Sequence, residues 1–218
     1  MAIAQGDLWG ARIWYEKALE IAEELAKDQT NTQAQRDLLI SYERLGEVAV
    51  AREDLSGARG WYEKALAISV ELAKDQMNAE AQRDLSISYN NLGKVSVAQG
   101  DLSLARGWYE KALAIREELA KDQTNAKALR DLAILYESYG DFTYAEGEFL
   151  DARKWYEKEL VIAEELAKDT TNIEAQRFLH IVWKKTEEIS RELGDLESAN
   201  KAFLKWRKLQ ETYNLNKQ

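Results

Sequence analysis

The sequence predicts an all-α protein built as a solenoid of antiparallel helical hairpins. One helical phrase recurs four times, as RIWYEKALEI, RGWYEKALAI twice and RKWYEKELVI, and its tryptophan returns every 47 residues, at Trp14, Trp61, Trp108 and Trp155. Proline is absent and there are only 11 glycines, so little in the composition interrupts long helices. A strict period of this length is typical of arrays in which each unit packs on its neighbours.

The unit at residues 78–121 shows how each pair of helices is specified. Asn78 is a favourable N-cap for the first helix. The apolar and small residues of that helix recur at steps of three and four, at Leu85, Ser88, Tyr89, Leu92 and Val95. Gly100 can adopt the left-handed conformation that ends the helix, and Asp101 can cap the next one. The second helix has its own stripe, formed by Leu102, Ala105, Trp108, Tyr109, Ala112, Leu113 and Leu119.

The segments KDQTN, KDQMN and KDTTN separate successive units and set the expected boundaries. About nine helices are expected, at residues 7–28, 32–52, 54–75, 78–99, 101–122, 125–146, 148–169, 172–193 and 195–213. We expect a single array made of a half repeat with only a second helix, three full repeats and a degenerate capping repeat, at residues 1–30, 31–77, 78–124, 125–171 and 172–218. Residues 201–218 at the end of the last repeat are basic, with Lys201, Lys205, Arg207, Lys208 and Lys217 against Glu211.

Composition excludes several classes of protein. The net charge of −9 disfavours binding to nucleic acid, and no arginine-rich tract offsets it. Cysteine is absent, which excludes disulfides and thiolate metal sites. The first ten residues lack the pattern of a signal peptide, and no stretch has the roughly 18 apolar residues of a membrane span. We therefore expect a cytoplasmic protein that binds neither membrane nor nucleic acid.

The repeated residues resemble the tetratricopeptide repeat, which places an aromatic residue, Leu-Gly, Ala, a second aromatic and Ala at set offsets. The pattern falls on Tyr89, Leu92, Gly93, Ala105, Tyr109 and Ala112, and also on Tyr42, Leu45, Gly46, Ala58, Tyr62 and Ala65. A third copy departs at Tyr139 and Glu159, and the last departs further, with Trp183, Thr186, Glu187, Ala199, Phe203 and Trp206. The usual unit has 34 residues and a closing proline, and HEAT-type repeats match the longer period better. The small residues favour the tetratricopeptide type, which implies a right-handed superhelix.

No arrangement of residues points to catalysis, a metal or a cofactor. His180 is the only histidine and lacks a helical metal-binding motif, so we interpret it as a packing or surface residue. No phosphate-binding glycine loop is present. The prediction is a protein that is not an enzyme.

The resemblance implies that the first helix of each hairpin lines a concave, partner-binding surface. Matched residue by residue, this candidate groove comprises Ile40, Glu43, Glu47, Val50, Ile87, Asn90, Lys94, Val97, Ile134, Glu137, Asp141, Tyr144, Ile181, Lys184 and Glu188, with Arg191 at its end. We interpret the constant isoleucine as a packing position. The variable middle positions fit either plain solvent exposure or recognition of a partner.

Two constant ladders accompany the groove. The arginines at Arg36, Arg83, Arg130 and Arg177 could grip an anionic partner, but their constancy favours ion pairs within or between hairpins. The tryptophans at Trp61, Trp108 and Trp155 could form an aromatic ladder for a ligand, but their repetition favours packing.

The predicted function is a non-catalytic scaffold that binds a protein or peptide partner. Two alternatives stay open, namely a sensor or regulatory arm of a larger signalling protein and a receptor for short signalling peptides. The first helix of the leading hairpin is missing before Met1, which is consistent with a fragment of a longer protein. The stripe of the opening helix, at Leu8, Ala11, Trp14, Tyr15 and Ala18, should then be partly exposed and covered by upstream sequence or by a second copy in a homodimer.

Overall fold

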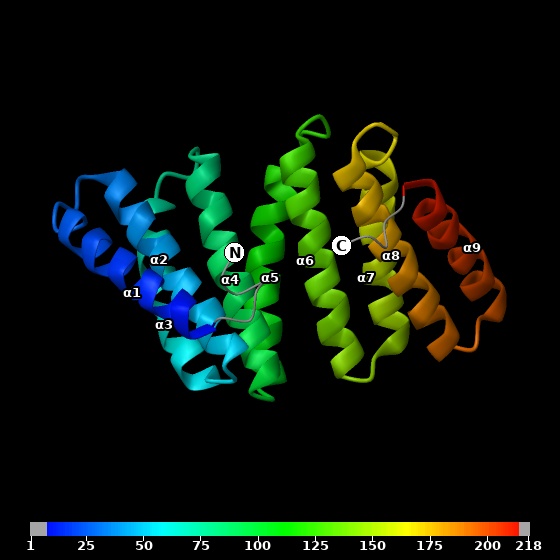
Figure 1. The fold of residues 1–218 in the computed structure, drawn as a ribbon, viewed down its shortest axis with the longest axis horizontal. Helices are drawn as coiled ribbons and strands as arrows, with labels where there is room; N and C mark the ends of the chain where they lie inside the picture. Colours follow the sequence, from blue (N-terminus) through cyan, green and yellow to red (C-terminus); the bar gives the residue numbers. More distant parts are fainter. Residues whose placement is uncertain (1–7, 214–218) are drawn as a thin grey trace. The chain divides into compact units, whose positions relative to one another are not determined.

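The computed structural model describes residues 8–213, which form α-helices and no strand (Figure 1). The helices in this range are α1 (Leu8–Leu25), α2 (Thr32–Ala51), α3 (Leu55–Leu72), α4 (Ala79–Ala98), α5 (Leu102–Leu119), α6 (Ala126–Ala145), α7 (Phe149–Leu166), α8 (Ile173–Glu192) and α9 (Leu196–Tyr213). The all-α class and the order of the helices are therefore as predicted. The predicted helix start at Asp7 and the charge of Lys217 lie outside the described residues.

Helices α1, α3, α5 and α7 each end three residues before the predicted boundary. The reason is a side-chain turn that the helical pattern conceals. The Oδ1 atom of Asp28 accepts hydrogen bonds from the backbone N and the hydroxyl of Thr30, at 3.0 and 2.6 Å. Gln35 then donates its amide to the carbonyl of Ala26 at 2.7 Å, which satisfies a group that the helix end leaves free.

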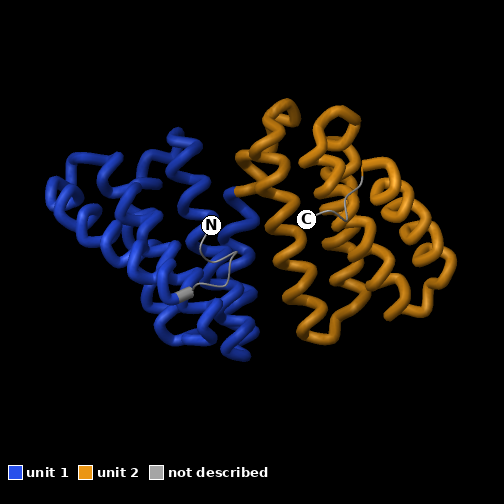
Figure 2. Tube along the Cα trace, in the orientation of Figure 1, with its two compact units in different colours: residues 1–115 blue, residues 116–218 orange. Residues whose placement is uncertain are grey.

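The chain divides into two compact units, residues 1–115 and 116–218 (Figure 2). Within the first, α2 packs on α3, and α3 packs on α4. Within the second, α6, α7, α8 and α9 pack in chain order, each on the next. A core cluster in the first unit joins Tyr62 of α3 to Leu92 and Val95 of α4, so one side chain links two hairpins.

Glycine and alanine allow the two helices of a hairpin to approach closely. A Cβ atom added at Gly93 would lie 2.6 Å from Cε1 of Tyr109, and one at Gly140 would lie 2.5 Å from Cε1 of Tyr156. Both distances are far below van der Waals contact, so no other residue fits without displacing the tyrosine. Ala58, Ala65 and Ala152 are completely buried. The small residues therefore have the packing role that the sequence indicated.

The turn between the helices of a hairpin depends on a left-handed residue. Gly100, Gly147 and Gly194 have φ angles of 80°, 80° and 71°. Asp101 then caps α5 by accepting from the backbone N of Leu104 at 3.1 Å, as predicted. Glu53 occupies the same place in the preceding repeat and also has a positive φ, of 60°. A non-glycine residue is strained in this region because its Cβ approaches the backbone carbonyl.

Glu53→Gly is expected to raise the free energy of unfolding by about 1 kcal/mol, because glycine removes this strain. Urea denaturation followed by circular dichroism measures the change. The reciprocal variant Gly100→Glu should lower the value by a similar amount. Two unchanged midpoints would show that the left-handed turn carries no strain.

Candidate partner-binding surface

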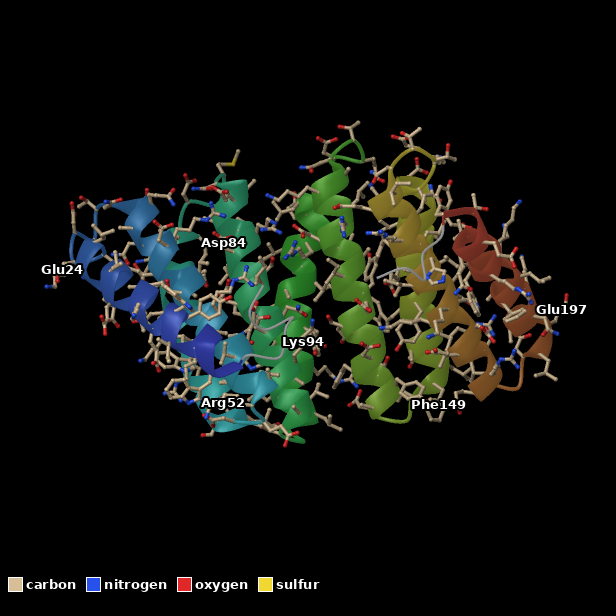
Figure 3. The ribbon with its side chains drawn as sticks, viewed as in Figure 1. Glu24, Arg52, Asp84, Lys94, Phe149 and Glu197 are labelled. Carbon is tan, nitrogen blue, oxygen red and sulfur yellow. The ribbon has the colours of Figure 1, made fainter. Side chains whose placement is uncertain are left out.

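The candidate groove residues lie on the first helices of the hairpins. In the first unit, α2 carries Ile40, Glu43, Glu47 and Val50, and α4 carries Ile87, Asn90, Lys94 and Val97. In the second unit, α6 carries Ile134, Glu137, Asp141 and Tyr144, and α8 carries Ile181, Lys184, Glu188 and Arg191. Figure 3 labels Asp84 and Lys94 among the side chains of α4.

Three of the four isoleucines of this surface are exposed, which makes their interpretation as packing residues wrong, whereas Ile87 on α4 is half-buried. Ile40, Ile134 and Ile181 keep 38%, 36% and 52% of their surface accessible. The cause is the position of α2, α6 and α8, whose buried faces point to the following helix and leave the isoleucine edge uncovered. Val50 and Tyr144, at 42% and 39%, extend the same apolar edge.

Two equivalent polar positions in the first unit hold buried acceptors that no group among residues 8–213 satisfies. Oε1 of Glu43 on α2 and Oδ1 of Asn90 on α4 are both out of contact with solvent and accept no hydrogen bond. Burial raises the pKa of Glu43 to about 8, and the nearby carboxylates of Asp84 and Glu47 add to the shift. Burying an acceptor without a hydrogen bond costs free energy, and a donor from a partner would remove that cost.

Two members of the arginine ladder, Arg36 and Arg130, form ion pairs between hairpins, as their constancy indicated. Arg36 on α2 donates to Oδ2 of Asp84 at 2.7 Å and to Glu80 at 2.5 Å, both on α4. Arg130 on α6 reaches Glu174 at the start of α8 at 3.3 Å. Arg36 is thereby neutralised by carboxylates of the chain itself.

A groove lies beside the Arg36 ion pairs, between the N-terminal ends of α2 and α4. Its volume is about 960 Å³, and Gln33, Leu72 and Asp84 are among its lining residues. The equivalent space between α6 and α8 has only about 250 Å³. Phe178 lines this smaller space, at the position that Asp84 occupies in the first unit.

The second unit replaces a small residue of the repeat with a carboxyl group. Glu159 of α7 stands where earlier repeats have Ala65 and Ala112, and only 1% of its surface is exposed. Lys185 of α8 donates to Glu137 at 2.6 Å and to Asp141 at 3.0 Å, both on α6. Burial raises the pKa of Glu159 to about 8, and the charge of Glu137 adds to the shift.

This cluster joins α6, α7 and α8 through polar groups. Tyr156 of α7 donates its hydroxyl to Asp141 of α6 at 2.7 Å, next to the ammonium of Lys185. From the sequence, Glu159 could be recognised only as a departure from the repeat, and not as part of a polar cluster. Lys185, at the position of Ser138 in the preceding repeat, was the second signal and was missed.

The repeated tryptophans pack on tyrosines of the preceding helix, which confirms the packing interpretation. The ring centroids of Trp61 and Tyr42 are 5.9 Å apart, and those of Trp108 and Tyr89 are 5.7 Å apart. Trp155 makes the same contact with Tyr136 at 5.7 Å. Each tryptophan is half-buried rather than part of an open ladder for a ligand.

His180 also packs, edge to face on Trp206 with centroids 5.7 Å apart, and burial lowers its pKa. Among residues 8–213, no group of three or more histidine, cysteine or acidic side chains is placed to hold a metal ion. No helix in the same range is long and apolar enough to cross a membrane.

Comparisons with known proteins confirm the resemblance drawn from the sequence. Residues 84–143 match the family model described as tetratricopeptide repeat. A search of curated proteins finds no match. Residues 84–143 are therefore similar to the tetratricopeptide repeat, and the fold is that of a helical repeat solenoid.

Three solved structures illustrate the likeness of fold. BtubC (BKLC) of P. vanneervenii is similar at 17% identity and a TM-score of 0.66, over 95% of this chain and 92% of its own. The nearly identical TPR-like repeats of a putative kinesin light chain from Podosopora anserina align at 16% identity and a TM-score of 0.60, over 98% of this chain and 91% of theirs. A de novo designed helical repeat protein aligns at 19% identity and a TM-score of 0.52, over 96% of this chain and 94% of its own.

Glu159→Gln is expected to weaken the dependence of stability on pH. Glu43 and Glu159 keep a proton in the folded chain up to about pH 8, whereas a glutamate of the unfolded chain loses its proton near pH 4.5. Because the folded state binds more protons in this window, these two groups stabilise it fully below pH 4.5, and that stabilisation is lost as the pH rises to 8. Glu159→Gln should remove about half of this slope.

Urea denaturation at several pH values measures the slope, and Glu164→Gln is the control because this carboxylate on α7 is exposed. Equal slopes for the wild type, Glu159→Gln and the control would contradict a protonated Glu159 in the folded chain.

Proposed function

We propose that this chain is a non-catalytic scaffold that binds a protein or peptide partner on the exposed edges of its first helices. The observation that carries the proposal is the set of exposed isoleucines, one on each of α2, α6 and α8. An apolar edge flanked by variable polar side chains is typical of a surface that a partner covers. In tetratricopeptide repeats generally, the same helices line the concave, partner-binding surface.

The unmet acceptors of Glu43 and Asn90 support a partner that supplies hydrogen-bond donors in the first unit. Peptide N–H groups or a lysine or arginine side chain would meet them. A cation beside Glu43 would also favour its ionised form. The second unit offers a different environment, because its carboxylates Glu137 and Asp141 are engaged by Lys185.

The scaffold is proposed to act in the cytoplasm. It could serve as an interaction arm of a larger signalling protein or as a receptor for short peptides, and the surface involved is the same in each case. The proposal includes neither a membrane nor a nucleic acid as partner, which agrees with the net charge of −9.

Site-specific photo-crosslinking in cells tests this proposal. A photoreactive benzoylphenylalanine replaces Ile181 on α8 in one variant and Val161 on α7 in another. Val161 is a matched control because it is an exposed aliphatic side chain, at 68%, but lies on a second helix. Mass spectrometry should identify a protein or peptide adduct at residue 181, and Ile134→Asp on α6 of the same unit should reduce its yield. Adducts only at residue 161, or equal adducts at both sites, would argue against binding on the first helices.

A further inference from the structure

The opening helix α1 presents an apolar face that the rest of the described chain leaves uncovered. Trp14, Ile21 and Leu25 keep 70%, 64% and 54% of their surface exposed, and Ala18 between them is exposed as well. The four residues follow steps of three and four, so they form one continuous line along the helix. We call these four residues the α1 stripe. Of the stripe expected from the sequence, Trp14 and Ala18 are exposed and Tyr15 is half-buried, whereas Ala11 is buried and the side chain of Leu8 lies outside the described residues.

The structure shows what covers the same line in a later repeat. On α3 the equivalent residues are Trp61, Ala65, Ile68 and Leu72. Ala65 is completely buried there and Trp61 is half-buried. The covering element is α2, which stacks Tyr42 on Trp61 and brings Gly46 against the ring of Tyr62. In the second unit, α6 covers α7 through Tyr136 and Gly140 in the same way.

A lysine on α1 makes a cation–π contact with a tryptophan but not with the tyrosine that accompanies it in a later hairpin. In the α2–α3 hairpin, the ammonium of Lys64 lies 4.4 Å from the ring centroid of Trp61 and 5.4 Å from that of Tyr42. In α1, Lys17 lies 5.4 Å from the ring centroid of Trp14, and no tyrosine from a preceding helix is stacked on that ring in the described chain. Tyr15 is likewise half-buried, whereas its counterpart Tyr62 is only 4% exposed.

We propose that the α1 stripe docks an amphipathic helix of about 20 residues that carries a tyrosine and, four residues later, a glycine. The tyrosine stacks on Trp14 beside Lys17, and the glycine lets the helix backbone approach Tyr15. A larger residue at the glycine position is excluded by the same overlap that excludes a Cβ atom at Gly46, Gly93 and Gly140. This partner surface is separate from the exposed edges of the first helices.

The observations favour such a helix over a second copy of this chain. In a two-fold contact, Trp14 would meet a stripe that offers neither the stacking tyrosine nor the glycine. The first helices that have these residues on α2 and α6 are already packed on α3 and α7, so a folded copy does not present them.

The probe is a fluorescent peptide of residues 78–98 of this chain, which contains α4 with its N-cap, Tyr89 and Gly93. Anisotropy with the full chain should show saturable binding to one site, accompanied by a gain of helix in circular dichroism. Trp14→Glu should weaken binding at least roughly tenfold, as for a central aromatic contact. A Gly93→Leu peptide should lose binding for the steric reason given above.

Trp9→Glu is the matched control, because Trp9 is equally exposed at 71% but lies about 140° away around the helix. It should leave binding unchanged. Absence of saturable binding, or equal binding by wild type and Trp14→Glu, would overturn the proposal. So would loss of binding in Leu204→Glu, which would place the peptide on α9, or light scattering that shows a dimer dissociated by Trp14→Glu.

Discussion

The contact between a glycine of the first helix and a tyrosine of the second, made in three of the hairpins, sets the geometry on which the rest of this structure depends. At Gly46, Gly93 and Gly140 the tyrosine ring occupies the space that a Cβ atom would need. The helices can therefore lie close enough for completely buried alanines, such as Ala58 and Ala152, to fill the remaining contact. In the first unit the same tyrosine position also reaches the following hairpin, because Tyr62 packs with Leu92 and Val95.

The chain varies this contact toward its C-terminal end by changing the residues around it. In the second unit, Glu159 replaces an alanine beside the polar cluster of Lys185, Tyr156 and their carboxylate partners, and its Oε2 atom is buried without a hydrogen-bond partner among the described residues. In the α8–α9 hairpin, Glu187 stands at the glycine position and accepts a hydrogen bond from Nε1 of Trp206 at 2.6 Å. The departure from the repeat at Glu187 is thus met by a specific polar contact.

Local features of the fold could be read from the sequence, whereas features that depend on neighbouring helices could not. Asn78, Gly100 and Asp101 act within one turn of their own position, so their capping roles were predictable. Periodicity places Ile40 at the border of a helix face, but its exposure depends on which helices pack beside α2. The pKa of Glu159 depends on groups from three helices, which no single stretch of sequence brings together. The residues of the candidate surface could be listed from the sequence, but the unmet acceptors of Glu43 and Asn90 could not be foreseen.

Replacing two glycines of one hairpin by alanine tests the central contact most directly. Gly46 of α2 faces the ring of Tyr62, whereas nothing lies within 4 Å of a Cβ atom at Gly60 of α3. Alanine favours a helix over glycine by about 1 kcal/mol, so Gly60→Ala should raise the free energy of unfolding in urea. Gly46→Ala should lower it, because overpacking costs about 1–3 kcal/mol and exceeds that gain. Opposite signs are the predicted result, and an increase in both variants would contradict the account.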